Sequence, residues 1–243
     1  MSETYTDRLT KLRNIIEEGN VVFFGGAGVS TESGIPDFRS TDGLYATKYA
    51  YPPEQIVSHS FFERDTAEFY RFYKEKMLYP NAEPNACHKA LAELEREGKV
   101  RAVVTQNIDG LHQKAGSKRV FELHGSVWRN YCRRCSKSHS LQEIIESEGV
   151  PKCGCGGVVK PDVVLYEEAL DDEVVTGAVR AIASARTLIV GGTSLAVYPA
   201  AGLLQYFRGA HLVVINRTPI SADENAELVF SEDIGKVFSD LQL

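Results

Sequence analysis

The sequence predicts a doubly wound α/β fold, in which helices cover both faces of a parallel sheet. Short apolar runs rich in β-branched residues alternate with helix-like stretches along the chain, as expected for strands that are buried on both faces. Apolar residues make up 43% and charged residues 25% of the 243 residues, which is typical of a globular protein with a sizeable core. The length fits one main core with a small insertion.

The apolar runs and the helical periodicities give the expected elements. We expect strands over 21–24, 100–105, 120–123, 163–166, 187–190, 212–216 and 227–230. We expect helices over 86–96, 171–185, 200–207 and 234–241, and the N-terminal segment 1–18 also has apolar residues at helical spacing.

Two segments interrupt this alternation. Residues 43–83 are aromatic and contain prolines but no candidate strand, and residues 129–157 contain two close pairs of cysteines. We expect these two insertions to form a small lobe. The remaining segments, 1–42, 84–128 and 158–243, then form a Rossmann-like main domain within one compact unit.

Charge and hydropathy narrow the class of partner. The formal net charge of −6 provides no general basic field, so a nucleic-acid partner is disfavoured. No apolar run approaches the roughly 20 residues that span a bilayer, and the N-terminus lacks the apolar block of a signal peptide. We therefore expect a cytoplasmic protein without a membrane partner, and a monomer.

The paired cysteines predict a metal site rather than disulfides. Cys132 and Cys135 are separated by two residues, and Cys153 and Cys155 by one, which is tighter than usual and is eased by Gly154. Four thiolates suit a tetrahedral zinc ion, and a closed set of four ligands leaves no position for a reactive water. The sequence therefore predicts one structural zinc ion, and it leaves Cys87 as a buried free thiol.

A glycine-rich turn follows the first expected strand, with glycines at 25, 26 and 28 before Ser30. Such a turn lets the backbone approach a pyrophosphate, although a tight turn needs glycines for backbone reasons alone. A redox dinucleotide site usually has an acidic residue after a second strand, about 20 residues on. Residues 45–49 are not a buried strand, so an ordinary dehydrogenase is disfavoured.

Polar residues also follow two other expected strands. The segment 105–109, Thr-Gln-Asn-Ile-Asp, lies where α/β folds bind their ligands, although Asp109 could simply cap the helix that follows. His124, followed by Gly125, is a candidate general base because an ordinary histidine titrates near neutrality. Taken alone, the position of His124 favours a structural role over a catalytic one.

Together these residues resemble the sirtuin family over nearly the whole chain. The matching motifs are Gly-Ala-Gly-Val-Ser at 26–30, Gly-Ile-Pro-Asp-Phe-Arg at 34–39, Thr-Gln-Asn-Ile-Asp at 105–109, His124-Gly125, the four cysteines, Lys-Pro-Asp-Val-Val at 160–164, Gly-Thr-Ser-Leu at 192–195 and Val-Val-Ile-Asn at 213–216. The resemblance implies an NAD⁺-dependent protein lysine deacetylase that transfers the acetyl group to ADP-ribose and releases nicotinamide. Its substrates would be acetylated proteins or peptides.

The resemblance also implies roles for individual residues. The NAD⁺ phosphates would contact Ala27, Ser30, Thr31 and Arg39. The ribose and adenine end would contact Gly192, Thr193, Ser194, Asn216, Arg217, Asp233 and Ile234. Phe38, Ile108 and Asp109 would surround nicotinamide, and Gln106 and Asn107 would contact its ribose, with His124 as general base. The acyl-lysine peptide would pair with Val163, Tyr166 and Val197.

The sequence departs from the family pattern near the peptide. Glu167 stands where many relatives have glycine, and Tyr70 and Tyr73 stand where relatives that remove carboxylated acyl groups have Tyr and Arg. We therefore expect acetyl and other uncharged acyl groups, including longer ones. The alternatives are a mono-ADP-ribosyltransferase on the same scaffold and a non-enzymatic NAD⁺- or partner-binding module, with a dehydrogenase the weakest.

Overall fold

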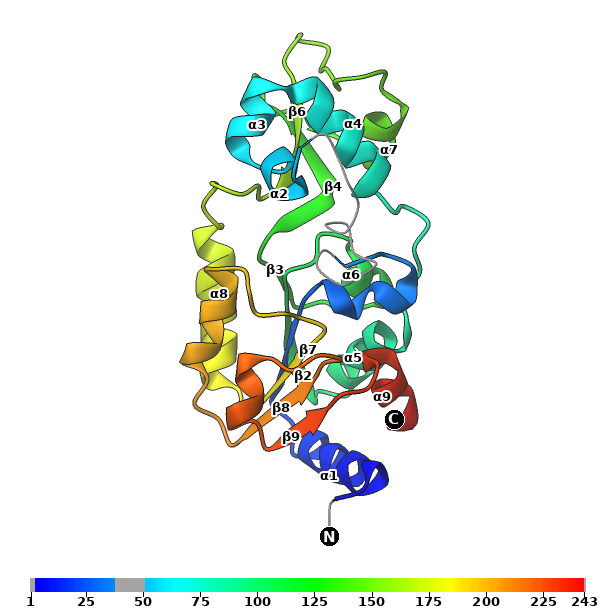
Figure 1. Cartoon of the computed structure of the whole chain (residues 1–243), viewed down its shortest axis with the longest axis vertical. Coiled ribbons are helices and arrows are strands. Elements are labelled where there is room, and N and C mark those ends of the chain that lie inside the picture. The colour runs from blue at the N-terminus through cyan, green and yellow to red at the C-terminus, as the bar shows by residue number, and fades with distance from the viewer. Residues whose placement is uncertain (1–2, 38–50, 243) are drawn as a thin grey trace.

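The computed structural model describes residues 3–37 and 51–242. The larger part is a six-stranded sheet in the order β3-β2-β1-β7-β8-β9, with every neighbouring pair parallel (Figure 1). Its strands are β1 (Val21–Gly25), β2 (Val100–Thr105), β3 (Val120–Glu122), β7 (Thr187–Gly191), β8 (His211–Ile215) and β9 (Leu228–Phe230). The central strands β1 and β7 are buried at every position, which confirms the predicted doubly wound α/β fold.

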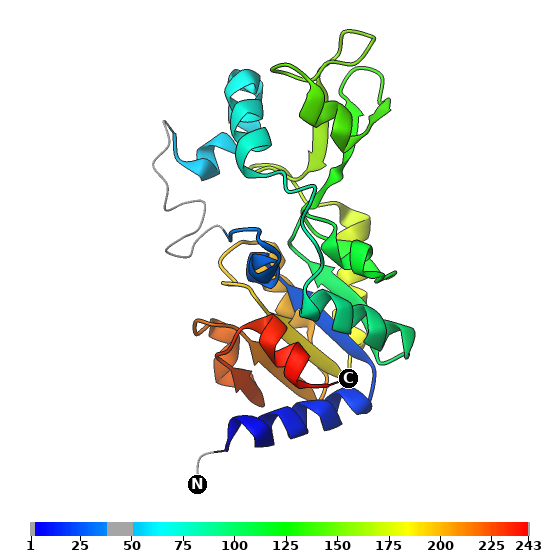
Figure 2. The ribbon, with the colours of Figure 1, turned by 90° about the vertical axis from the view of Figure 1, so that its right-hand side faces the viewer.

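Helices cover both faces of this sheet. On one face, α1 (Tyr5–Glu17), α5 (Ala86–Arg96) and α9 (Ile234–Asp240) share an apolar core with the strands (Figure 2). On the other face lie α8 (Asp172–Ser184) and the 3₁₀ helices η4 (Ala200–Tyr206) and η5 (Ser221–Asn225). Each large apolar side chain that becomes fully buried stabilises the fold by roughly 1.5–3 kcal/mol.

Helix α5 begins at a cap that also contacts the glycine-rich turn. The side-chain oxygen of Asn85 accepts hydrogen bonds from the backbone N–H groups of Cys87 (3.0 Å) and His88 (3.4 Å). The side-chain amide of Asn85 donates to the carbonyl of Val29 (2.7 Å) and the hydroxyl of Ser33 (3.1 Å). The start of α5 therefore holds the turn that follows β1.

The smaller part is a separate lobe with its own core. A three-stranded antiparallel sheet contains β4 (Gly125–Cys132), β5 (Ser138–His139) and β6 (Val159–Val163), in the order β5-β4-β6. It packs with α2 (Pro53–Ile56), α3 (His59–Arg64), α4 (Thr66–Lys76) and α7 (Leu141–Glu146) (Figure 1). The described part of the first insertion and the cysteine-containing insertion thus share one apolar core.

One expected strand is wrong and one expected helix differs in type. Strand β6 ends at Val163, where the expected strand over 163–166 begins, and β6 belongs to the small antiparallel sheet. Burial alternates along β6, so its strand pattern includes the polar Lys160, whereas the apolar run after Val163 leaves the sheet. The expected helix over 200–207 is a 3₁₀ helix at 200–206. The strands β4 and β5 were not predicted because polar residues interrupt them.

An ion-pair network joins the two sheets. Arg129 on β4 donates from Nε to Asp162 on β6 (2.6 Å) and from Nη1 to Glu122 at the end of β3 (2.6 Å). Glu122 belongs to the large sheet and lies two residues before His124. Arg129 therefore fixes the junction between the two sheets close to His124. Among the helices in the described ranges, none is long and apolar enough to cross a membrane.

Candidate active site

The glycine-rich turn lies against the end of a second strand. After β1, the chain forms the short 3₁₀ helices η1 (Ala27–Val29) and η2 (Thr31–Ser33). The N–H of Gly28 donates to the carbonyl of Gly192 (2.8 Å), and a Cβ atom on Gly28 would lie 2.9 Å from the Cα of Gly192. Glycine is therefore required for this close approach, which forms one wall of the cavity described below.

A buried polar cluster lies beside this turn. The hydroxyl of Ser30 donates to Oδ2 of Asp109 (2.6 Å) and accepts from the amide of Asn107 (3.1 Å). The other carboxylate oxygen of Asp109 accepts from the N–H of Leu111 (2.9 Å) at the start of α6 (Leu111–Ala115). Burial raises the pKa of Asp109, against the opposing effect of these two hydrogen bonds. Asp109 therefore both caps the turn and contributes to the site.

His124 is oriented by a backbone carbonyl. Its Nδ1 lies 3.0 Å from the carbonyl oxygen of Gln106, so Nδ1 carries the proton and Nε2 is left to accept one. Burial lowers the pKa of His124, although the Gln106 carbonyl works in the opposite direction. His124 is therefore neutral at neutral pH, in the tautomer that a general base requires.

The opposite end of the site is formed by the turns after β7 and β8. The side chain of Gln106 donates to the hydroxyl of Thr193 (3.1 Å), and the N–H of Thr193 donates to Oδ1 of Asn216 (2.9 Å). Arg217 forms an ion pair with Asp233 just before α9. These contacts place polar side chains from several strand ends at one edge of the sheet, where α/β folds bind ligands.

One cavity of about 590 Å³ brings these groups together. It is lined by every predicted cofactor, catalytic and peptide residue within the described ranges: Ala27, Ser30, Thr31, Gln106, Asn107, Ile108, Asp109, His124, Val163, Tyr166, Gly192, Thr193, Ser194, Val197, Asn216, Arg217, Asp233 and Ile234. The predicted contacts Phe38 and Arg39 lie outside the described residues. The role of each residue towards NAD⁺ or the peptide stays a prediction.

Tyr73, which the sequence placed in the acyl pocket, lines this cavity, together with residues of the small lobe that the sequence did not single out. An apolar branch extends into the small lobe and is lined by Phe69, Tyr73, Met77, Val127 and Leu141. Phe69 and Tyr73 lie one helical turn apart on α4, with their rings stacked at 5.4 Å. No motif marks these residues, because their spacing is that of any buried helix face.

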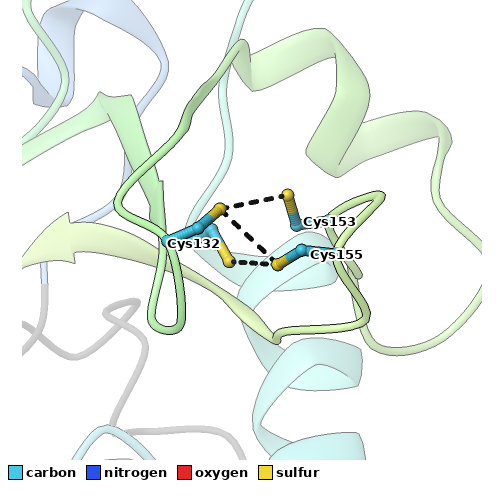
Figure 3. A group of neighbouring side chains, drawn as sticks. Cys132, Cys153 and Cys155 are labelled. Atoms are coloured by element: carbon cyan, nitrogen blue, oxygen red, sulfur yellow. Dashed lines mark hydrogen bonds between the residues drawn. The ribbon is translucent and has the colours of Figure 1, made fainter.

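The four paired cysteines meet in the small lobe. The sulfur of Cys155 lies 3.5 Å from that of Cys132 and 3.5 Å from that of Cys135, and all four sulfurs lie within 4.8 Å of one another (Figure 3). A zinc ion with four thiolate ligands at 2.3 Å requires sulfurs about 3.8 Å apart. The cluster therefore fits a structural zinc ion, and Cys87 is a separate, buried free thiol as predicted.

Comparison with known proteins identifies the family. The model of the Sir2 family matches residues 26–199. The chain is 63% identical over 236 residues to an NAD-dependent protein deacetylase of Clostridium perfringens, with 95% of this chain and 97% of the relative covered. This chain belongs to the Sir2 family, the sirtuins.

Solved Sir2 structures have the same fold. A Sir2 with a deacetylated p53 peptide and 3′-O-acetyl ADP-ribose superposes with a TM-score of 0.89 at 38% identity, covering 96% of this chain and 97% of that one. A Sir2 with a p53 peptide and NAD⁺ gives a TM-score of 0.85 at 37% identity, with the same coverage. The resemblance to sirtuins that the motifs indicated is thus confirmed.

Proposed function

We propose that this sirtuin is an NAD⁺-dependent protein lysine deacetylase that forms deacetylated lysine, nicotinamide and O-acetyl-ADP-ribose. The observation that carries this proposal is a single cavity lined by the neutral His124 and by the buried Ser30–Asn107–Asp109 cluster. Relatives named NAD-dependent protein deacetylase, up to 63% identical over nearly the whole chain, support the same activity.

The residues divide the chemistry between them. Bound NAD⁺ supplies an electrophilic ribose carbon when nicotinamide departs, and the acyl oxygen of the substrate is the nucleophile. Asp109, which lines the cavity, would stabilise the positive charge that develops as nicotinamide leaves, and Ser30 fixes its carboxylate. The free Nε2 of His124 would take a proton from a sugar hydroxyl, so that this oxygen attacks the acyl carbon. Lysine then leaves as the protonated amine, and one water molecule supplies the remaining oxygen of O-acetyl-ADP-ribose.

The phosphate and adenine contacts stay predictions from the family. Ala27, Ser30 and Thr31 would bind the phosphates at the glycine-rich turn, together with Arg39. Thr193, Asn216 and Asp233, with their neighbours, would bind the ribose and adenine at the far end. The exact domain bounds along the chain, the monomeric state and the cytoplasmic location likewise remain predictions from the sequence.

The shape of the small-lobe branch supports a second candidate, the removal of longer uncharged acyl groups. Its lining is mostly apolar, and Lys76 on α4, which also lines the cavity, is ion-paired with Glu75 (2.7 Å). A carboxylated acyl chain would lack a counter-ion of its own at this wall. We therefore expect acetyl and longer aliphatic acyl groups to be accepted, and succinyl groups to be rejected.

The proposal is tested by mass spectrometry of an acetyl-lysine peptide incubated with the protein, with and without NAD⁺. Deacetylation only in the presence of NAD⁺ supports the proposed activity. Nicotinamide release with an unchanged peptide mass would favour the alternative of ADP-ribosyl transfer, which would also move adenylate-labelled NAD⁺ onto protein. Absence of any turnover with acetyl, butyryl and octanoyl peptides would favour a binding module.

A further inference from the structure

Glu167 has an unusual backbone conformation at the peptide end of the cavity. It follows β6 and lines the cavity beside Tyr166, and its φ angle is +76°, in the left-handed region that favours glycine. A side chain at such a position is disfavoured unless its own contacts compensate. The hydrogen bonds of the Glu167 side chain therefore indicate what offsets this backbone conformation.

Those contacts fasten Glu167 to the small lobe. Its two carboxylate oxygens accept hydrogen bonds from the backbone N–H of Ser60 (2.8 Å) and from the Ser60 hydroxyl (2.9 Å), in the first turn of α3. Backbone hydrogen bonds between Tyr166 and residues 57 and 59 run alongside. Both Ser60 groups are uncharged, so the carboxylate is held in place without being neutralised.

The adjacent acid is neutralised, and Glu167 is not. Glu168 forms an ion pair with Lys160 (3.0 Å) and a hydrogen bond with Nδ1 of His59 (2.9 Å). Glu167 is exposed and forms no ion pair with any residue of 3–37 or 51–242. Among the described residues at the peptide end of the cavity, where Tyr166, Leu170 and Tyr198 also contribute, Glu167 therefore has a fixed negative charge that no cation pairs with.

We propose that Glu167 is a specificity-determining residue that selects acyl-lysine peptides with an arginine or lysine next to the modified lysine. The inference rests on the proposed deacetylase function and on entry of the peptide beside Tyr166. A fixed carboxylate at the rim attracts a cationic side chain and repels an acidic one. Because the Ser60 hydrogen bonds hold the carboxylate in position, little side-chain entropy is lost when a peptide cation pairs with it.

The experiment measures kcat/KM for acetyl-lysine peptides that are identical except for Arg, Gln or Glu at one flanking position. The wild-type protein is expected to prefer the Arg peptide over the Gln peptide, and the Gln peptide over the Glu peptide, by about two- to fivefold per step, as for an exposed ion pair. Added salt is expected to reduce the preference, because exposed charges are screened.

Two variants separate the charge from the structural contact. Glu167→Gln removes the charge and keeps an oxygen that can accept from Ser60, and Glu167→Gly removes both while relieving the backbone conformation. Both are expected to bring the ratio between the Arg and Glu peptides close to one. Glu173→Gln, which removes an exposed acid of α8 outside the cavity lining, is the control and is expected to leave the ratio unchanged.

The outcomes distinguish this inference from the proposed function. Equal kcat/KM values for the three peptides with the wild-type protein, or an unchanged ratio in Glu167→Gln, would overturn the role of Glu167 while deacetylation itself stands. If Glu167→Gln lowered kcat/KM equally for all three peptides, Glu167 would be only a structural contact, and its proposed role in specificity would be overturned. Failure to deacetylate even the Gln peptide would refute the proposed function, and the inference with it.

Discussion

His124 shows how one backbone contact prepares a side chain for acid–base chemistry. The carbonyl of Gln106 holds the proton on Nδ1, and burial favours the neutral ring, so Nε2 is available as a base. The sequence indicated His124 only through its place after a strand and through the family resemblance. The carbonyl contact could not be predicted, because it depends on how β2 and β3 pair.

The first prediction concerns the His124→Ala variant. Because His124 is proposed to act in proton transfer, we expect deacetylation to fall by at least about 100-fold, the typical contribution of a general base. Thermal stability and zinc content are expected to remain close to those of the wild-type protein, measured by calorimetry and metal analysis. Wild-type activity in this variant would refute the assigned role.

The second prediction concerns the pH dependence of kcat/KM. A base is active when neutral, which for His124 means at pH values above its pKa, and burial lowers that pKa from 6.5. We therefore expect kcat/KM to stay level as the pH falls to 6.5 and to decline only below it. A pH profile whose acid limb lies above 6.5 would contradict the neutral, desolvated state of His124.

At the scale of elements, buried strands were easier to predict than the small lobe. The parallel strands are continuous apolar runs, so β1, β2 and β8 were found with their ends correct to about one residue. Burial along strand β4 does not alternate regularly, and its pairing with β6 has a register shift between Ser126 and Asn130. This irregular pattern hid the strand in the sequence. The cysteine spacing located the metal cluster without predicting the sheet around it.

The third prediction concerns Cys132, the buried last residue of β4, whose sulfur lies close to those of the 153–157 turn. Cys132→Ser removes one of four zinc ligands, so we expect lower zinc content, a lower melting temperature and loss of activity as the small lobe loosens. Cys87→Ser, which removes the one cysteine outside the cluster, is the matched control and is expected to retain zinc. Zinc content unchanged in Cys132→Ser would refute the metal assignment.

At the scale of the whole molecule, two cores meet at the active site. The large sheet and the small lobe have separate apolar clusters, and the cavity lies between them with residues from both. The fold class and the cofactor edge were predictable from local patterns, because strand ends and glycine turns have local signatures. The apolar small-lobe part of the cavity was anticipated only at Tyr73, because the rest of it arises from packing α4 against β4 and α7.

The fourth prediction concerns the pH dependence of stability. His88 and His112 are buried in contact, with ring centroids 4.7 Å apart, and no described residue hydrogen-bonds to either ring nitrogen of His112. Burial lowers the pKa of His88 from 6.5 to about 4, and burial, with a smaller effect of His88, holds the pKa of His112 well below 6.5. The unfolded chain therefore binds protons first, so stability is present above pH 6.5 and is lost as the pH falls towards 4.

The expected loss from His88 alone is about 3 kcal/mol, from a difference of roughly 2.5 pKa units at 1.36 kcal/mol each. This expected loss is tested by measuring the free energy of unfolding by urea denaturation at pH values between 7 and 4. His88→Gln is expected to reduce this loss of stability at low pH. If His88→Gln lost as much unfolding free energy between pH 7 and pH 4 as the wild-type protein, other groups would cause the acid sensitivity.

The central claim is that one cavity couples NAD⁺ cleavage to removal of the acetyl group. The most direct measurement is the amount of nicotinamide, deacetylated peptide and O-acetyl-ADP-ribose formed in the same reaction, determined by mass spectrometry over its time course. We expect the three products to appear in equal amounts throughout the reaction. Deacetylated peptide accompanied by free acetate and intact NAD⁺ would mean a plain hydrolase, and would contradict it.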